Sequence, residues 1–165
     1  NKQVVNRAVE KSLAVRPGPT EFFTTPSPFN SLLWFVAAKD SGGYYTAYRS
    51  VFDKGPVQFT YFPRNDQRAD TISNQKDLQL LKKFAQGYYT IEKWGDTTIL
   101  NVLRFGQVVG WYNPKEKFSF HYYLTYPKEN DLVVQRGRFM HWNSQTAKAF
   151  FRRMFGSPLD PPRGK

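Results

Sequence analysis

Residues 32–52 read LLWFVAAKDSGGYYTAYRSVF, and this stretch indicates the fold class. The unbroken apolar run from Leu32 to Ala38 is typical of a buried strand. Ser41-Gly42-Gly43 follows it and predicts a hairpin turn, because glycines readily adopt the positive φ angles of tight turns. Tyr44 to Phe52 alternates in character and is the returning strand. The stretch therefore predicts an antiparallel hairpin with a buried first strand.

Similar patterns on both sides of this hairpin predict further hairpins and three helices. The segment Thr24 to Asn30 is expected to be rigid and extended, because each of its prolines restricts the residue before it. The expected strands are 32–38, 44–52, 57–62, 88–93, 97–105, 118–126 and 132–136, and the expected helices are 1–14, 75–86 and 143–155. We therefore expect an α+β fold: about seven mostly antiparallel strands in a curved sheet, flanked by an N-terminal helix, one inner helix and a C-terminal helix.

Capping residues mark the ends of two of these helices. Asn74 can cap the inner helix and Gly87 ends it. Asn143 can cap the C-terminal helix. The N-terminal helix starts without a capping residue, which suggests either that its upstream part was removed or that a native chain end frays there. We expect a single soluble domain over residues 1–156 and a flexible, proline-rich tail over 157–165.

The composition excludes several classes of protein and of site. The chain has 165 residues, no Cys and two His, so thiolate nucleophiles, zinc fingers and iron–sulfur sites are excluded. The apolar run at 32–38 is too short for a membrane span.

The net charge is +11. Residues 1–16 hold four basic side chains and one acidic, and residues 136–165 hold seven and one. Such basic ends could face anionic lipid headgroups, face nucleic-acid phosphates, or form an ordinary solvated surface.

No catalytic pattern is evident among the residues. His121 lies within an expected strand, where a half-buried structural role is the alternative to catalysis. His121 and His141 have no zinc-binding spacing, and no nucleophile elbow or glycine-rich phosphate loop is present. The aromatic residues of the strands could stack nucleic-acid bases, but they come from the nearly neutral middle of the chain. A role for them in the core is therefore favoured, and nucleic acid is an unlikely partner.

Four stretches together are similar to a known family. They are Thr24 to Trp34 (TTPSPFNSLLW), Tyr44-Tyr45 followed by Val51-Phe52-Asp53, Phe84 to Tyr89 (FAQGYY), and Leu103 to Gly106 (LRFG). They resemble the soluble C-terminal region of bacterial predicted membrane-bound metal-dependent hydrolases, and the resemblance extends from the first helix to Phe155.

The resemblance implies that the functional metal lies outside this chain. In such a parent protein, several upstream membrane helices carry the His and Asp residues that are taken to bind a divalent metal. This chain would then hold no metal or cofactor of its own, and its first helix would continue from a membrane span. The parent would be anchored in the membrane, and the basic residues close to that span would place this domain in the cytoplasm by the positive-inside rule.

The candidate functional residues fall into two groups. The segment around Asn30 is either an edge strand and turn that pack Phe29 and Trp34, or a groove in which Asn30 and Thr25 offer hydrogen bonds. An arginine on an aromatic sheet must be paired, stacked or exposed, so strand arginines are further candidates. The candidate ligand-facing residues are Asn30, Trp34, Arg49, Arg104 and His121. The candidate membrane-surface residues are Lys2, Arg7, Lys11, Lys148, Arg152 and Arg153.

These features predict an accessory domain of a membrane-bound hydrolase. The domain would lack a catalytic centre of its own, and it would contact the membrane surface, the substrate or its own upstream transmembrane region. The alternative is a module that binds nucleic acid or a small molecule through an aromatic sheet and basic terminal helices. A deep polar pocket would favour the small-molecule alternative.

Overall fold

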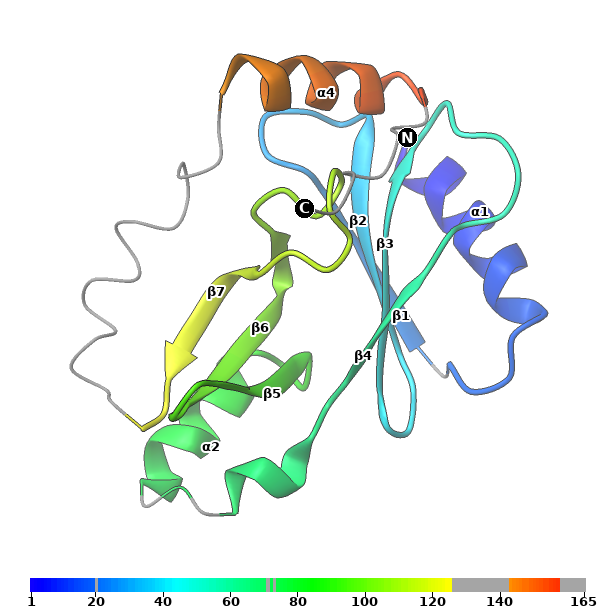
Figure 1. Ribbon diagram of the computed structural model, residues 1–165. Coiled ribbons are helices and arrows are strands. Elements are labelled where there is room, and N and C mark those ends of the chain that lie inside the picture. The colour runs from blue at the N-terminus through cyan, green and yellow to red at the C-terminus, as the bar shows by residue number, and fades with distance from the viewer. Residues whose placement is uncertain (20, 71, 73, 126–142, 158–165) are drawn as a thin grey trace.

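The computed structural model describes residues 1–19, 21–70, 72, 74–125 and 143–157. Figure 1 shows the elements and their order. They are α1 (Lys2–Ala14), β1 (Glu21–Pro26), β2 (Leu33–Lys39), β3 (Gly43–Ser50), β4 (Thr60–Pro63), the 3₁₀ helix η1 (Asp66–Ala69), α2 (Gln75–Phe84), β5 (Tyr89–Trp94), β6 (Thr97–Gln107), β7 (Phe118–Tyr123) and α4 (Ser144–Met154). The α+β class and the antiparallel pairing of the strands are confirmed.

The strands form two open sheets, with the order β1-β2-β3-β4 in one and β5-β6-β7 in the other. The two sheets are separated along the chain by η1 and α2, which lie between β4 and β5. The segment expected to be extended, Thr24 to Asn30, overlaps the end of β1, which pairs with β2 from Glu21↔Lys39 to Pro26↔Trp34. Proline is tolerated there because β1 is an edge strand of its sheet. The expected strand at 132–136 lies outside the described residues.

Strand β2 is buried on both faces, as its apolar run predicts. Trp34 and Val36 face α1, where they pack on Val5 and Val9. Successive strand residues point to opposite faces, so the residues between them face the second sheet. The cluster between the sheets contains Phe35, Ala37, Tyr44, Leu103 and Phe118. Together, α1, the two sheets and α2 form four layers (Figure 1).

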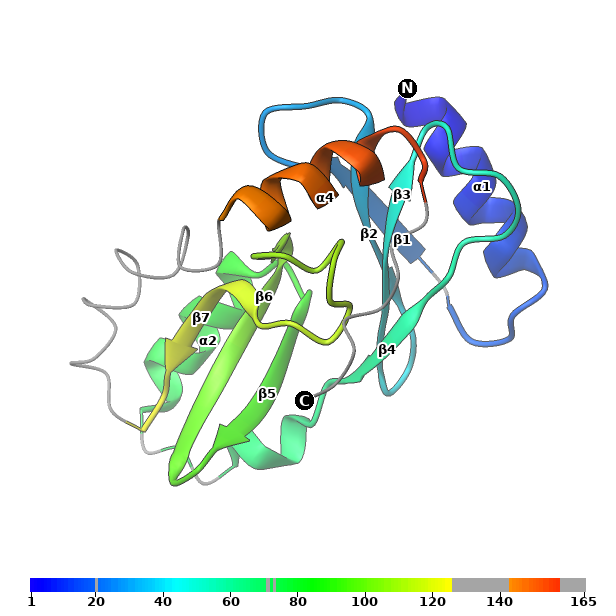
Figure 2. The same cartoon turned by 45° about the horizontal axis from the view of Figure 1, so that its top comes forward.

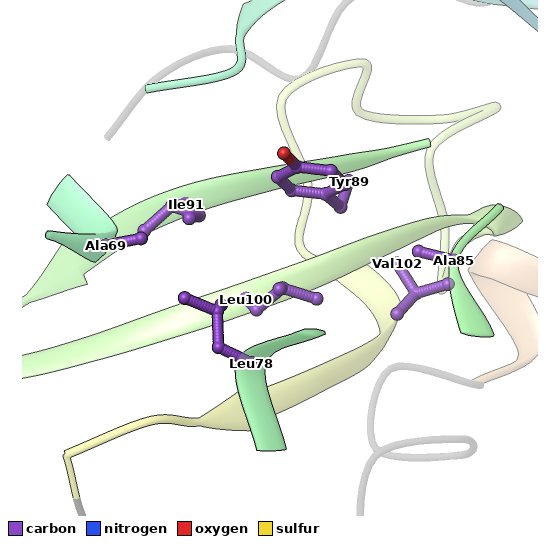
Figure 3. Close-up of a cluster of buried hydrophobic side chains, with 7 residues drawn as sticks. All are labelled: Ala69, Leu78, Ala85, Tyr89, Ile91, Leu100 and Val102. Carbon is purple, nitrogen blue, oxygen red and sulfur yellow. The ribbon is translucent and has the colours of Figure 1, made fainter. Parts of the chain in front are cut away.

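The other face of the second sheet packs on α2. Figure 3 shows the cluster, in which Leu78 and Ala85 pack against side chains of β5 and β6. Its members are Ala69, Leu78, Ala85, Tyr89, Ile91, Leu100 and Val102. The expected cap of α2 is present, because the Asn74 side chain accepts a hydrogen bond of 3.1 Å from the backbone N–H of Asp77. Gly87, just beyond the helix, has φ +78°, which suits a helix end.

Helix α4 covers one end of the two-sheet core (Figures 1 and 2). Phe150 and Met154 pack against Leu33, Val109 and Trp111. The helix begins with a reciprocal cap: the Asn143 side chain accepts from the backbone N–H of Thr146 at 2.9 Å, and the Thr146 hydroxyl accepts from the backbone N–H of Asn143 at 2.8 Å. The expected helix and its capping residue are confirmed.

The turn between β2 and β3 differs from the prediction. Neither Gly42 nor Gly43 has a positive φ angle. Gly43 is instead required by a close approach: a Cβ at this position would lie 2.3 Å from the carbonyl oxygen of Phe62 on β4. The glycine therefore lets β4 pair closely with β3.

Helix α1 is amphipathic, with Val5 and Val9 buried and Lys2, Arg7 and Lys11 exposed. No helix within the described residues is both long enough and apolar enough to cross a membrane.

The contact between α2 and the second sheet can be tested with two leucines of the same helix. Leu78 is 1% exposed and Leu80 is 58% exposed. Leu78→Ala should lower the free energy of unfolding by about 2–5 kcal/mol, because it removes buried methyl groups and leaves a cavity. Leu80→Ala should change it by about 0.5 kcal/mol or less. Urea unfolding measures both values, and equal losses would contradict this packing.

Candidate functional site

Arg49 on β3 is a buried arginine, with 8% of its surface exposed. Its Nη2 donates a hydrogen bond of 2.7 Å to the backbone carbonyl of Asp53. Its Nε lies 4.0 Å from Oδ2 of the Asp53 carboxylate, which is too long for a hydrogen bond. Arg49 is therefore held at the end of β3 by the turn that follows, while much of its donor capacity is unused by the described residues.

Asp53 is bound mainly by Arg153 of α4. Nη1 and Nη2 of Arg153 donate to Oδ1 and Oδ2 of Asp53 at 2.6 and 2.7 Å. Nη2 also donates to the backbone carbonyl of Tyr48 at 2.7 Å. The backbone N–H of Ser50 donates to Oδ2 at 2.8 Å. Arg153 is thus engaged in a bidentate pair inside the molecule, and we do not retain it among the membrane-surface residues.

The two arginines share a single carboxylate, so this cluster has a surplus positive charge. Burial lowers the pKa of Arg49, Asp53 opposes that effect, and the charge of Arg153 lowers the pKa further. Arginine nevertheless stays protonated at neutral pH, because its pKa starts above about 12. The surplus charge is therefore a constant property of the site.

Two cavities meet at Arg49. One, of about 610 Å³, lies between β3, the loop after it and α4, and Asp53, Lys54 and Arg153 contribute to its walls. The other, of about 620 Å³, lies along α1. Both are lined by Arg49, Pro56, Val57 and Gln58. We call these two neighbouring cavities together the Arg49 cleft. Their charged lining residues are Arg7, Lys11, Arg16, Arg49, Asp53, Lys54 and Arg153.

A third cavity, of about 340 Å³, is mostly aromatic. The hydroxyl of Ser27 is buried there and has no hydrogen-bond partner among the described residues. Tyr48 lines both this cavity and the Arg49 cleft. The Tyr48 hydroxyl accepts from the backbone N–H of Gln107 at 2.8 Å, and burial raises its pKa. The aromatic lining is completed by Phe29, Phe35, Phe105, Trp111, Phe120 and Phe150.

Asn30 and Trp34 have structural roles. Oδ1 of Asn30 accepts from the backbone N–H groups of Leu32 and Leu33 at 2.9 and 2.7 Å, which shapes the turn between β1 and β2. Nε1 of Trp34 donates to the carbonyl of Ser31 at 2.9 Å, and its ring is buried beneath α1. Of the two alternatives for the segment around Asn30, the structure therefore has the edge strand and turn. Phe29, however, is not packed: it is fully exposed and has φ +61°.

His121 and Arg104 line none of these three cavities. The His121 ring lies between Trp94 and Tyr123, with centroid distances of 5.0 and 5.8 Å. Its Nδ1 is 3.3 Å from the carbonyl oxygen of Phe118. Burial lowers the pKa of His121, and the nearby Lys117 lowers it further. Arg104 on β6 is half-buried and forms no ion pair within the part of the chain that is described.

The candidate membrane-surface residues are divided between two places. Arg7 and Lys11 line the Arg49 cleft, and Lys2 is exposed at the start of α1. Lys148 and Arg152 are exposed on α4. Sequence reasoning did not identify Asp53 or Arg16 as functional. For Asp53, the four-residue spacing from Arg49 could have indicated an ion pair. For Arg16, no local pattern indicates that it reaches the same cleft.

Comparisons with known protein families, with curated proteins and with solved structures found no match to this chain. The resemblance implies that the ligands of the metal lie outside this chain. Among the described residues, no three His, Asp or Glu side chains gather closely enough to hold a metal ion, so these residues do not supply the donor set of a metal centre.

The Asp53–Arg153 pair should be a major source of stability. Arg153→Met should lower the free energy of unfolding by about 3 kcal/mol, because it breaks a largely buried ion pair and frees the carbonyl of Tyr48. Lys148→Met on the exposed side of the same helix should have little effect. Chemical denaturation of the two variants tests this, and similar values for both would show that the pair contributes nothing specific.

His121 should titrate below the ordinary histidine value of about 6.5. Because its pKa is lowered in the folded state, the unfolded chain takes up the proton first, so stability should fall as the pH drops below about 6.5. Lys117→Gln should raise the pKa of His121 by removing a neighbouring positive charge. NMR titration measures these values, and His121→Asn identifies the signal. A pKa at or above the ordinary value would contradict the burial of the ring.

Proposed function

We propose that this chain is an accessory domain that docks on an anionic membrane surface. In this proposal the parent is a membrane-bound metal-dependent hydrolase of the kind that residues 24–34 resemble. The metal and its ligands would belong to an upstream transmembrane region, which would also be the domain's partner. The domain itself would supply binding and orientation, without a catalytic step.

The observation that carries the proposal is the composition of the outward face of α4. Its residues form pairs at helical spacings of three and four: Lys148 with Phe151 and Arg152, and Phe155 with Arg152 and Phe151. All four are exposed. They lie opposite Phe150 and Met154, which face the core. Neither Lys148 nor Arg152 forms an ion pair with a described residue. Exposed cations beside exposed aromatic rings are typical of surfaces that bind anionic bilayers.

Neighbouring segments extend this face at the same end of the molecule. The N-terminus, α4 and the turn between β1 and β2 lie together in both views (Figures 1 and 2). Nδ2 of Asn1 donates to the carbonyl of Ser31 at 3.0 Å, which joins the first residue to the turn that carries Phe29. Phe52 stacks on Phe155 with a centroid distance of 6.0 Å. We define the docking face as Lys2, Phe29, Phe52, Lys148, Phe151, Arg152 and Phe155.

This arrangement supports attachment to a membrane through α1. A membrane helix that continued into α1 would bring the docking face toward the bilayer, because the start of α1 lies at the same end of the molecule as α4 (Figures 1 and 2). Lys2 would then lie close to the headgroups, where Lys and Arg contribute about 1 kcal/mol each at an anionic surface. Exposed phenylalanines would add interfacial burial of apolar area.

Co-sedimentation with vesicles tests the proposal. The chain should bind vesicles of phosphatidylglycerol and phosphatidylcholine, and bind pure phosphatidylcholine weakly. Lys148→Gln combined with Arg152→Gln should weaken the partition coefficient about 30-fold, since two cations at about 1 kcal/mol each are removed. The melting temperature should not change, because both side chains are exposed.

A matched control removes the same charge elsewhere. Lys76→Gln combined with Lys83→Gln changes two exposed lysines of α2, far from α4 (Figure 1). This variant should bind vesicles like the unmodified chain. If both double variants lost binding equally, attraction by net charge would explain the result and the docking face would be wrong.

A further inference from the structure

We infer that the Arg49 cleft binds a small molecule that carries a phosphate group. Of the residues that define the docking face, Phe52 also lines this site, but the cations of the two places differ and the site does not depend on membrane binding. Its charged residues come from α1, the segment after it, β3, the loop after β3, and α4, so only the tertiary structure assembles them.

The charge balance of the cleft favours an anion. Among its described lining residues, the basic side chains are Arg7, Lys11, Arg16, Arg49, Lys54 and Arg153, and the acidic one is Asp53. The Asp53 carboxylate is already occupied on both oxygens by Arg153. Arg49 shares this carboxylate only through a long contact of 4.0 Å, and Arg7, Lys11, Arg16 and Lys54 form no ion pair with a described residue. A space that collects uncompensated positive charge raises the local concentration of anions.

Arg49 gives the cleft a fixed donor at the junction of its two halves. Of its three guanidinium nitrogens, only Nη2 donates to a described residue. Nε and Nη1 are not among the buried atoms that lack a partner, and they remain available to an acceptor that enters the cleft. Phosphate oxygens match the planar donor geometry of arginine, and hydrogen bonds between two charged groups are the strong ones.

The walls of the cleft are held in place before any ligand binds. The Ser12 hydroxyl donates to the carbonyl of Ala8 at 2.8 Å and accepts from the backbone N–H of Val57 at 2.9 Å, which ties the loop after β3 to α1. The guanidinium of Arg16 lies over the rings of Tyr45 and Phe59 at 4.9 and 5.7 Å. Such preorganisation lowers the entropic cost of binding.

The number of cations favours a phosphate over a single carboxylate. A carboxylate carries one negative charge, whereas a phosphate monoester carries up to two at neutral pH. Trp111 and Phe52 line the half of the cleft near α4 and offer apolar surface for the rest of the molecule. A soluble phosphorylated compound and a phospholipid headgroup share this chemistry, and the experiment below distinguishes them.

Isothermal titration calorimetry with inorganic pyrophosphate tests the site. The unmodified chain should show a single saturable site that weakens as salt is added. Arg49→Gln should weaken binding about tenfold or more, because a charge-assisted hydrogen bond is lost. Arg7→Gln combined with Lys11→Gln should weaken it by a similar factor without unfolding the chain, because both residues are exposed on α1.

The control here is the test variant of the vesicle experiment, Lys148→Gln combined with Arg152→Gln, which removes the same charge outside the cleft. It should change pyrophosphate affinity by about twofold or less. This variant also separates the two proposals, because it should lose vesicle binding but keep pyrophosphate. Equal weakening by the control and by the Arg7 and Lys11 variant would overturn the site.

A second arm uses vesicles that contain phosphatidic acid. If pyrophosphate does not bind, and these vesicles bind through Arg7 and Lys11, the same site takes its phosphate from a lipid headgroup. If neither ligand depends on these residues, the inference is wrong. Tighter binding of a single-stranded oligonucleotide than of pyrophosphate, lost in the same variants, would also overturn it in favour of nucleic acid.

Discussion

The structure depends on one carboxylate, that of Asp53. The carboxylate accepts hydrogen bonds from both terminal nitrogens of Arg153 and from the backbone N–H of Ser50. The backbone carbonyl of Asp53 accepts a further hydrogen bond from Arg49. These bonds join β3 and the loop after it to α4, which lies about a hundred residues further along the chain. A largely buried carboxylate is costly to desolvate unless it is paired and hydrogen-bonded, so the surrounding backbone and the helix are constrained together.

This constraint orients α4 and thereby separates two surfaces. Arg153 points inward to Asp53, so the opposite side of the helix, with Lys148 and Phe151, faces outward. The pairing also leaves Arg49 with surplus positive charge at the meeting point of two cavities. The inward side of this region is thus suited to a small anion and the outward side to an anionic surface, for different physical reasons. In the cleft, partly desolvated donors converge, whereas on the docking face exposed cations act beside apolar rings.

Local patterns predicted much of the secondary structure. The apolar run of β2, the Asn74 cap of α2 and the Asn143 cap of α4 rest on neighbouring residues, and all three are confirmed. The patterns offered an edge strand before Asn30 only as one of two alternatives, because the partner of β1 is chosen by packing of the sheet. They also gave the wrong reason for the glycine at position 43. A glycine is required there because a side chain would collide with a backbone carbonyl of β4. The division into two sheets depends on packing between residues far apart in the chain, such as Ala37 and Leu103. The periodicity of a short stretch of sequence cannot predict such packing.

The candidate site shows the same limit. The sequence by itself determined the α+β class, the positive charge of both terminal regions, the amphipathic helices, and Arg49 as an arginine in need of a partner or an exposed position. Only the tertiary structure decided that Arg153 satisfies Asp53, that Arg7, Lys11 and Arg16 share a cleft with Arg49, and that Phe29 is exposed. The physical reason is that charge and periodicity are properties of single residues and their neighbours. Pairing and convergence instead depend on the distances that folding sets between residues remote in the chain.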